Sequence, residues 1–360
     1  MKFVVYSILF LLICKHSFSQ NHKTENLIVV VLDGMRWQEV FTGADSVLMN
    51  NAVFTKDKEN VSKKFWDNDV NIRRKKLFPF LWETVAQQGQ IYGNRLAGCT
   101  VNVSNPFQLT YPGFSEMLTG YADPAIISNK SVTSQSDNVL EFINSKEGFN
   151  RKVAVFATSD LFPYLLNGPK SKLYINADTD TFSFTGGSFK LLNKMQQLSY
   201  KPTTERPDLL TYFDAIEYCK MYRPRVLYLA LGETDAYAHQ GNYEQYLETA
   251  FAEDRMIKEL WQMIQALPQY KNKTAIIITC DHGRGDSIKE QWTKHGPDIK
   301  DSGEIWIAAM GPGIQAKGEI HVAMQLYQAQ LAATIAGILG YDFKPKTHQA
   351  FPVIRELIGK

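Results

Sequence analysis

Seven residues with metal-binding or nucleophilic side chains stand out, because most of them follow an apolar run typical of a buried strand. They are Asp33, Thr110, Asp235, His239, Asp281, His282 and His295. Carboxylate oxygen and imidazole nitrogen are common zinc ligands. The lack of thiolate suits zinc, and three imidazoles favour it over manganese. Asp235 and His239 are four residues apart and share one face of a helical turn. The set predicts a metal centre.

Six amino-acid ligands divide into two sites of three, which leaves room for Thr110 and a substrate oxygen. Two divalent ions about 4 Å apart would clamp the attacking and leaving oxygens of an in-line phosphoryl displacement. One ion would activate the Thr110 hydroxyl, which is a weak nucleophile unaided. Pro112 places Thr110 at or just before a helix N-terminus, which favours anions. The alternatives are a simple N-cap for Thr110 and a capping Asp281 beside a packed His282.

The elements that must position these residues are apolar strands alternating with amphipathic helices. Strands are predicted at 27–32, 152–157, 225–231, 276–280 and 304–310, and helices at 77–88, from about 110 to 120, and at 207–222, 242–267 and 326–339. This alternation predicts one α/β domain, with a mostly parallel central sheet and helices on both faces. Ligands bind beyond the carboxyl ends of such strands.

The composition and charge of the chain are those of an ordinary globular protein and argue against nucleic-acid binding. The 360 residues are 44% hydrophobic and 21% charged with a net charge of +2, as in an ordinary globular protein. The single basic cluster, residues 73–76, suits a solvated face, so no nucleic-acid polymer is expected as a partner. Cys99, Cys219 and Cys280 are expected to be free buried thiols, with a Cys99–Cys219 disulfide as the alternative.

The first 19 residues have the pattern of a signal peptide. A basic residue precedes an apolar stretch at 3–14, too short to span a bilayer comfortably, and small residues follow at 17–19. Cleavage would leave a single domain at 20–360, exported to the periplasm or the medium as a soluble protein without an integral membrane segment. Lipid anchoring at Cys14 is disfavoured, because the residues before it are not small.

Five segments in order resemble the alkaline phosphatase superfamily, most closely its type I phosphodiesterase/nucleotide pyrophosphatase group. They are Val31-Leu32-Asp33-Gly34, Leu109-Thr110-Tyr111-Pro112 with Leu118-Thr119-Gly120, Asp235 to His239, Cys280-Asp281-His282-Gly283, and His295-Gly296. The resemblance spans nearly the whole chain after residue 19. It implies an alkaline-phosphatase-like α/β/α sandwich and an enzyme that hydrolyses phosphoric esters with two zinc ions.

Residue by residue, the resemblance implies one zinc ion held by Asp33, Thr110, Asp281 and His282, and another held by Asp235, His239 and His295. Thr110 would be the nucleophile that forms a covalent phospho-enzyme. The resemblance also implies an Asn that touches a phosphoryl oxygen. Asn129 is the best match, although it follows Gly120 more closely than is usual.

Two departures from the family pattern bear on the substrate, a small-molecule phosphoester. Gly113-Phe114 replaces the Asn-His usual in nucleotide hydrolases, which argues against carrying over nucleotide specificity. Ser159-Asp160-Leu161 stands where some monoesterases carry Lys-Asp-Arg, which favours a diester or another singly charged substrate. The alternatives are a phosphate monoesterase on the same site, a phosphoryl-group transferase and a non-catalytic zinc-binding protein.

Overall fold

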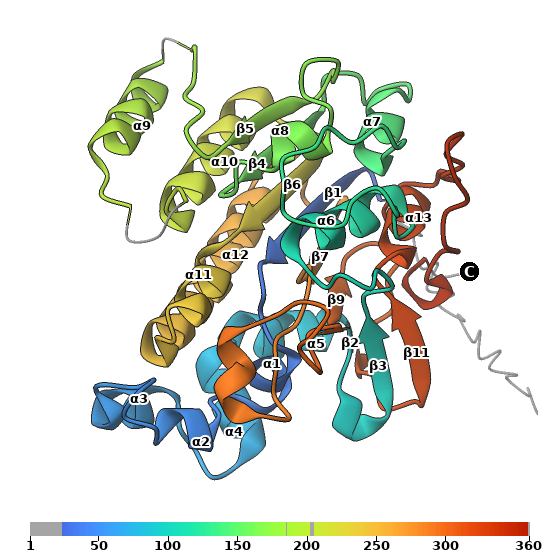
Figure 1. Ribbon diagram of the computed structural model, residues 1–360. Coiled ribbons are helices and arrows are strands. Elements are labelled where there is room, and N and C mark those ends of the chain that lie inside the picture. The colour runs from blue at the N-terminus through green and yellow to red at the C-terminus, as the bar shows by residue number, and fades with distance from the viewer. Residues whose placement is uncertain (1–23, 185, 202–204, 359–360) are drawn as a thin grey trace, which may run out of the picture.

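The computed structural model describes residues 24–184, 186–201 and 205–358. The predicted signal peptide lies outside these residues. Eight strands form the central sheet in the order β10-β2-β9-β7-β1-β6-β4-β5 (Figure 1). A smaller sheet has the order β11-β3-β8. The α/β class and the mostly parallel sheet agree with the prediction.

Five parallel strands form the middle and one side of the central sheet. They are β7 (Thr274–Thr279), β1 (Asn26–Leu32), β6 (Val226–Leu231), β4 (Val153–Ala157) and β5 (Tyr174–Ala177). Every residue of the first four is buried, which explains why the sequence shows continuous apolar runs rather than alternation. Val31 is in register with both Ala230 and Thr279, so β1, β6 and β7 end at one edge.

The remaining strands depart from the predicted pattern. They are β9 (Ile307–Met310), β2 (Gly89–Tyr92) and β10 (Gly318–Glu319) in the central sheet, and β11 (Met324–Tyr327), β3 (Cys99–Asn102) and β8 (Glu304–Ile305) in the small sheet. The single strand predicted at 304–310 is therefore wrong. The chain divides at Trp306, whose buried indole donates to the Met35 carbonyl at 3.1 Å. The strand β11 also occupies the start of the helix predicted at 326–339.

Helices cover both faces of the sheet. Neighbouring Val155 and Phe156 of β4 pair with Tyr228 and Leu229, so Phe156 and Tyr228 point to opposite faces. Helix α10 (Asp208–Tyr222) packs on Phe156, and α6 (Thr110–Thr119) reaches Tyr228 through Met117. Figure 1 shows α12 (Tyr243–Ala266) on the side of α10 and α13 (Gln330–Ile338) beside α6.

The other helical segments are shorter. They are α1 (Trp37–Thr42), α2 (Ser46–Met49), α3 (Lys58–Phe65), α4 (Val70–Leu77), a π-helical turn at Leu81–Val85, α5 (Ala86–Gln88), α7 (Val139–Asn144), α8 (Phe162–Leu165), α9 (Gly187–Leu198), α11 (Glu233–His239) and 3₁₀ turns at Arg95–Ala97, Lys289–Thr293 and Arg355–Leu357. The helix predicted at 77–88 is confirmed at residues 79–88, which form one helical segment that includes the π-helical turn, whereas Leu77 ends α4. The buried Asp254 carboxylate accepts hydrogen bonds from the N–H groups of Phe80 and Leu81 and so caps the start of this segment. No helix within the described ranges is long and apolar enough to cross a membrane.

Buried polar contacts fix helix α6 in place. The Glu116 carboxylate accepts hydrogen bonds from the backbone N–H groups of Ser104 and Asn105, both at 2.7 Å, and of Ala329 at 3.1 Å. These bonds satisfy a carboxylate that would be costly to bury alone. Cys99, Cys219 and Cys280 are free and buried, as expected.

The approach of α6 to the end of β7 generates a stability prediction. A Cβ atom at Gly113 would lie 2.4 Å from the Asp281 carbonyl oxygen. Gly113→Ala should therefore lower the free energy of unfolding by about 1–3 kcal/mol, the usual cost of overpacking. Urea unfolding measures the change. The control is Gly187→Ala in α9, where a Cβ would meet no atom within 4 Å and stability should change by less than about 1 kcal/mol. Equal effects would contradict the packing argument.

Candidate active site and metal centre

Three carboxylates meet at the edge where β1, β6 and β7 end. Asp33 follows β1, Asp235 lies in the first turn of α11 after β6, and Asp281 follows β7. The Nε2 atom of His282 lies 3.3 Å from Asp33 Oδ1, 3.4 Å from Asp281 Oδ2 and 3.8 Å from Asp235 Oδ1. The structure thus gathers three of the predicted ligands around the imidazole nitrogen of a fourth, His282.

The predicted nucleophile lies against this cluster. Thr110 is the first residue of α6, and its Oγ1 lies 3.3 Å from His282 Nε2. Leu109 occupies the N-cap position and Thr110 is already helical, so the simple N-cap alternative for Thr110 is wrong. Asn129 lies beside it, with Oδ1 accepting a hydrogen bond from the Tyr111 N–H at 2.9 Å.

The last two predicted ligands, His239 and His295, lie next to Asp235. His239 Nε2 is 3.2 Å from Asp235 Oδ2 and 3.0 Å from His295 Nε2, which is itself 3.8 Å from Asp235 Oδ1. Two groups have ligand atoms that all lie within 4.8 Å of one another: Asp33, Asp281 and His282, and Asp235, His282 and His295. His282 enters both groups because its ring stacks on that of His295 at 3.8 Å. Half-exposed His239 adjoins the second group.

The histidine hydrogen bonds suit metal binding. His282 Nδ1 lies 2.9 Å from the Gly283 carbonyl, and His295 Nδ1 lies 3.0 Å from the Gln108 carbonyl. A carbonyl only accepts, so Nδ1 carries the proton and Nε2 presents its lone pair to the cluster. Such backbone contacts orient metal-ligating imidazoles. Burial, with His282 as neighbour, also lowers the pKa of His295 to about 2 and keeps it neutral.

The buried carboxylates lack a counter-charge. Asp33 Oδ1 and Asp281 Oδ2 have no hydrogen-bond donor among the described residues. Burial raises the pKa of both carboxyls well above the usual range. Neighbouring carboxylates, among them Asp235, raise these pKa values further. Isolated buried charge is costly, and a divalent cation is the usual compensation. The oxygen and nitrogen donors present here fit zinc.

Asp235 has a protein partner as well. Burial would raise the pKa of this carboxyl, but the Arg284 guanidinium, His239 and His295 together lower it well below the usual range. Arg284 Nη2 donates to Asp235 Oδ1 and, at 3.0 Å, to its backbone carbonyl. Gly34 permits this approach, because it adopts φ +61° and a Cβ there would lie 2.6 Å from Asp235 Oδ1.

A cavity of about 610 Å³ opens onto the cluster. It is lined by the predicted residues Asp33, Thr110, Asn129, Asp235 and His239, and also by Ser159, Asp160, Leu161, Glu205, Gly232, Ala236 and Gln240. Burial, with the nearby carboxylates of Asp235, Asp208 and Asp160, raises the pKa of Glu205 to about 7, and a hydrogen bond from Ser159 opposes this. Sequence reasoning missed Glu205, because it lies in a loop before α10 and not at a strand end.

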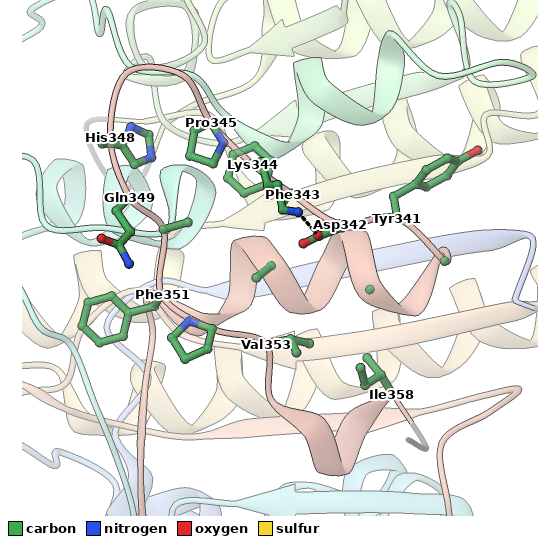
Figure 2. A pocket seen from close by; sticks show the side chains of 15 residues that line it. Tyr341, Asp342, Phe343, Lys344, Pro345, His348, Gln349, Phe351, Val353 and Ile358 are labelled. Carbon is green, nitrogen blue, oxygen red and sulfur yellow. Dashed lines mark ion pairs between the residues drawn. The ribbon is translucent and has the colours of Figure 1, made fainter.

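A second cavity lies in the C-terminal segment of the described residues. It has a volume of about 680 Å³ and is lined by Tyr341, Phe343, His348, Phe351 and their neighbours (Figure 2). His348 stacks on Tyr121 at 3.9 Å and contacts the Thr119 carbonyl at 2.7 Å, so it packs the fold. None of the predicted site residues lines this cavity.

Comparison with known proteins places this site in a family. The model of the type I phosphodiesterase / nucleotide pyrophosphatase family matches residues 40–356. The chain belongs to this family. No curated protein matches the chain. The phosphodiesterases and nucleotide pyrophosphatases that give the family its name are hydrolases of phosphoester bonds.

Solved structures confirm the alkaline phosphatase superfamily fold. The alkaline phosphatase PafA superposes with a TM-score of 0.64 at 11% identity, covering 94% of this chain and 99% of PafA. The 2-O GAG sulfatase BT1596 gives 0.58 at 13% identity over 94% and 75% of the two chains. The lipoteichoic acid synthase LtaP from Listeria monocytogenes gives 0.57 at 13% identity over 89% and 73%. At this identity the likeness establishes the fold alone.

The uncompensated carboxylates generate a prediction for the metal-free protein. Because the folded-state pKa values of Asp33 and Asp281 are raised, the folded state holds protons that the unfolded state releases above about pH 4. The free energy of unfolding should therefore fall as pH rises, by about 1.4 kcal/mol per pH unit for each carboxyl that stays protonated. Urea unfolding from pH 4.5 to 8 measures the slope.

Zinc provides the control for this experiment. A bound cation keeps the carboxylates ionised in the folded state, so saturating zinc should flatten the slope and stabilise the protein most at high pH. A metal-free protein whose stability rises with pH would contradict the assigned electrostatics.

Proposed function

We propose that this protein is an exported di-zinc phosphoester hydrolase that acts on diesters with Thr110 as its nucleophile. One observation carries the proposal: the Thr110 hydroxyl lines the cavity and lies 3.3 Å from His282 Nε2, inside the cluster of carboxylates and imidazoles. Export is proposed from the composition of residues 1–19. Threonine is not a precursor of the formylglycine that sulfatases require, which argues against sulfate esters.

The ligands divide between two ions in this proposal. Asp33, Thr110, Asp281 and His282 would hold one, and Asp235, His239 and His295 would hold the other. When bound, the ions supply positive charge that activates the hydroxyl and stabilises the phosphoryl oxygens. Zinc is preferred to manganese because three of the ligands are imidazoles.

The protein groups around Thr110 orient the reaction. Thr110 Oγ1 attacks phosphorus and gives up its proton, and one alcohol takes up a proton and leaves from the opposite side. Water then cleaves the covalent phospho-enzyme, which still carries the second ester group, to release a phosphate monoester and restore the hydroxyl. Asn129 uses Oδ1 to accept from the Tyr111 N–H, which leaves its Nδ2 hydrogens free to donate to a phosphoryl oxygen in the cavity. The α6 N-terminus adds its dipole to the stabilisation of the anion.

The charges of the cavity favour a singly charged substrate. Neither Lys nor Arg is among the described residues that line it, whereas Glu205 and Asp160 add two carboxyl groups to those of the proposed metal ligands. A phosphate monoester carries a second negative charge that would approach these carboxylates without a basic partner. The charges of the cavity therefore support a phosphodiesterase rather than a phosphate monoesterase on the same site.

Paired hydrolysis of a chromogenic aryl phosphate diester and monoester tests the proposal. Zinc-loaded protein should prefer the diester, and Thr110→Ala should lower kcat by roughly 10³-fold or more, because the nucleophile is lost. Zinc content, measured by elemental analysis, is the control and should stay near two ions. Full activity in Thr110→Ala would refute the nucleophile. Bound zinc without turnover of either ester would instead support a transferase or a binding protein.

Glu205 provides a separate test of substrate charge. Glu205→Gln removes a carboxylate from the cavity at nearly constant shape, so kcat/KM for the monoester should rise on the order of tenfold relative to the diester. The ratio of the two kcat/KM values is the measurement. Asp160→Asn is the matched control, because Asp160 is exposed and its charge is screened by solvent. An unchanged ratio in Glu205→Gln would count against electrostatic selection.

A further inference from the structure

A buried carboxylate outside the predicted ligand set contacts the loop that carries two of the ligands. Asp208 is the first residue of α10 and is fully buried. Its side chain does not cap its own helix. Instead, Oδ1 accepts from the Gly232 N–H and Oδ2 accepts from the Glu233 N–H, both at 2.8 Å. The carboxylate thus holds the N-terminus of the neighbouring helix, α11.

The contact is reciprocal and extends to a third segment. Glu233 Oε2 accepts a hydrogen bond from the Asp208 backbone N–H at 2.9 Å, so each helix start is capped by a side chain of the other. The Thr158 hydroxyl, just after β4, donates to Asp208 Oδ1 at 2.5 Å. Asp208 therefore joins the segments that follow β4 and β6 to the start of α10.

Helix α11 depends on such outside support. It has only seven residues, Glu233–His239, a length at which a helix is not stable alone. It carries Asp235 and His239, so the direction of its first turn sets where both side chains point. The Thr234 hydroxyl donates to the Asp33 carbonyl at 2.8 Å and fixes the other side of this turn. The ligand-bearing turn is held between Asp208 and β1.

We infer that Asp208 is a positioning residue for the metal site of Asp235, His239 and His295, acting through the N–H groups of Gly232 and Glu233. The inference rests on the metal centre of the proposed function. Groups that orient metal ligands from outside the coordination sphere typically contribute 10–100-fold to metal affinity. Loss of Asp208 should therefore weaken one of two ions and leave the ion of Asp33, Asp281 and His282 in place.

The Asp208→Asn substitution removes this function with little change in shape. A carboxylate can accept at both oxygens, whereas an amide has one acceptor and one donor. Whichever way the amide is turned, its NH₂ group would face the N–H of Gly232 or of Glu233. One of the two N–H groups then loses its partner in the interior, and the turn that bears Asp235 is released.

Asp214→Asn is the matched control. Asp214 is a second buried carboxylate of α10, and its Oδ2 accepts from Arg206 Nη1 at 3.1 Å. Asp214→Asn removes a buried ion pair but leaves the hydrogen bonds of Asp208 with Gly232 and Glu233 intact. Any loss of metal affinity that follows from general destabilisation of α10 would thus appear in both variants.

The experiment is a zinc titration of metal-free protein against a chromophoric chelator, with the visible spectrum of the Co²⁺-loaded protein as a second readout. Asp208→Asn should weaken one of the two ions by roughly 10–100-fold and alter the Co²⁺ spectrum. Asp214→Asn should change neither. Unchanged affinity in Asp208→Asn, or the same loss in both variants, would overturn the positioning role.

A second pair of variants covers the case in which Asp208→Asn does not fold. Glu233→Ala removes the reciprocal acceptor and should weaken the same ion, whereas Glu233→Gln keeps an acceptor and should restore wild-type affinity. Equal affinity in these two variants would overturn the inference. Wild-type protein that binds two ions but hydrolyses no ester would refute the proposed function and leave the positioning role standing.

Discussion

The concentration of negative charge at one edge of the sheet is the constraint on which the rest of this structure depends. Asp33, Asp235 and Asp281 are brought together because β1, β6 and β7 are adjacent, parallel and in register. Burial makes that proximity unfavourable unless positive charge is nearby. Arg284 pairs with Asp235, whereas Asp33 and Asp281 form no ion pair with a Lys or Arg among the described residues. This excess of negative charge is the physical basis of the proposed metal centre.

Much of this arrangement could be predicted from sequence, because fully buried parallel strands leave a continuous apolar signature and the ligands follow directly after it. Asp33 and Asp281 were found in this way, and Thr110 by the proline of its helix. Errors arose where a distant partner decides the local structure. Trp306 divides one apolar run between two sheets, and Asp254 caps the start of the helical segment at 79–88, which therefore begins two residues later than predicted.

Glu205 and Asp208 show a different limit of sequence reasoning. Both lie in the polar segment Glu205-Arg206-Pro207-Asp208, whose composition suits an ordinary helix start. Their environment is set by tertiary contacts: Arg206 is fully buried and donates to the Ala157 carbonyl at 2.8 Å, which anchors the segment beside the end of β4. A buried Arg between two acids is a weak pattern without the fold, and only the structure brings the segment to the cavity.

The position of β1 in the middle of the central sheet affects how the chain folds. β1 precedes the other strands of the described residues, yet its neighbours are β6 and β7, which lie about two hundred or more positions later. The contacts of Asp33 with Thr234 and of Gly34 with Asp281 illustrate this separation. Non-local pairing of this kind slows folding and prolongs exposure of apolar segments. The apolar strand β1 therefore stays unpaired until β6 and β7 have been synthesised, and the proposed metal centre needs the chain as far as His295.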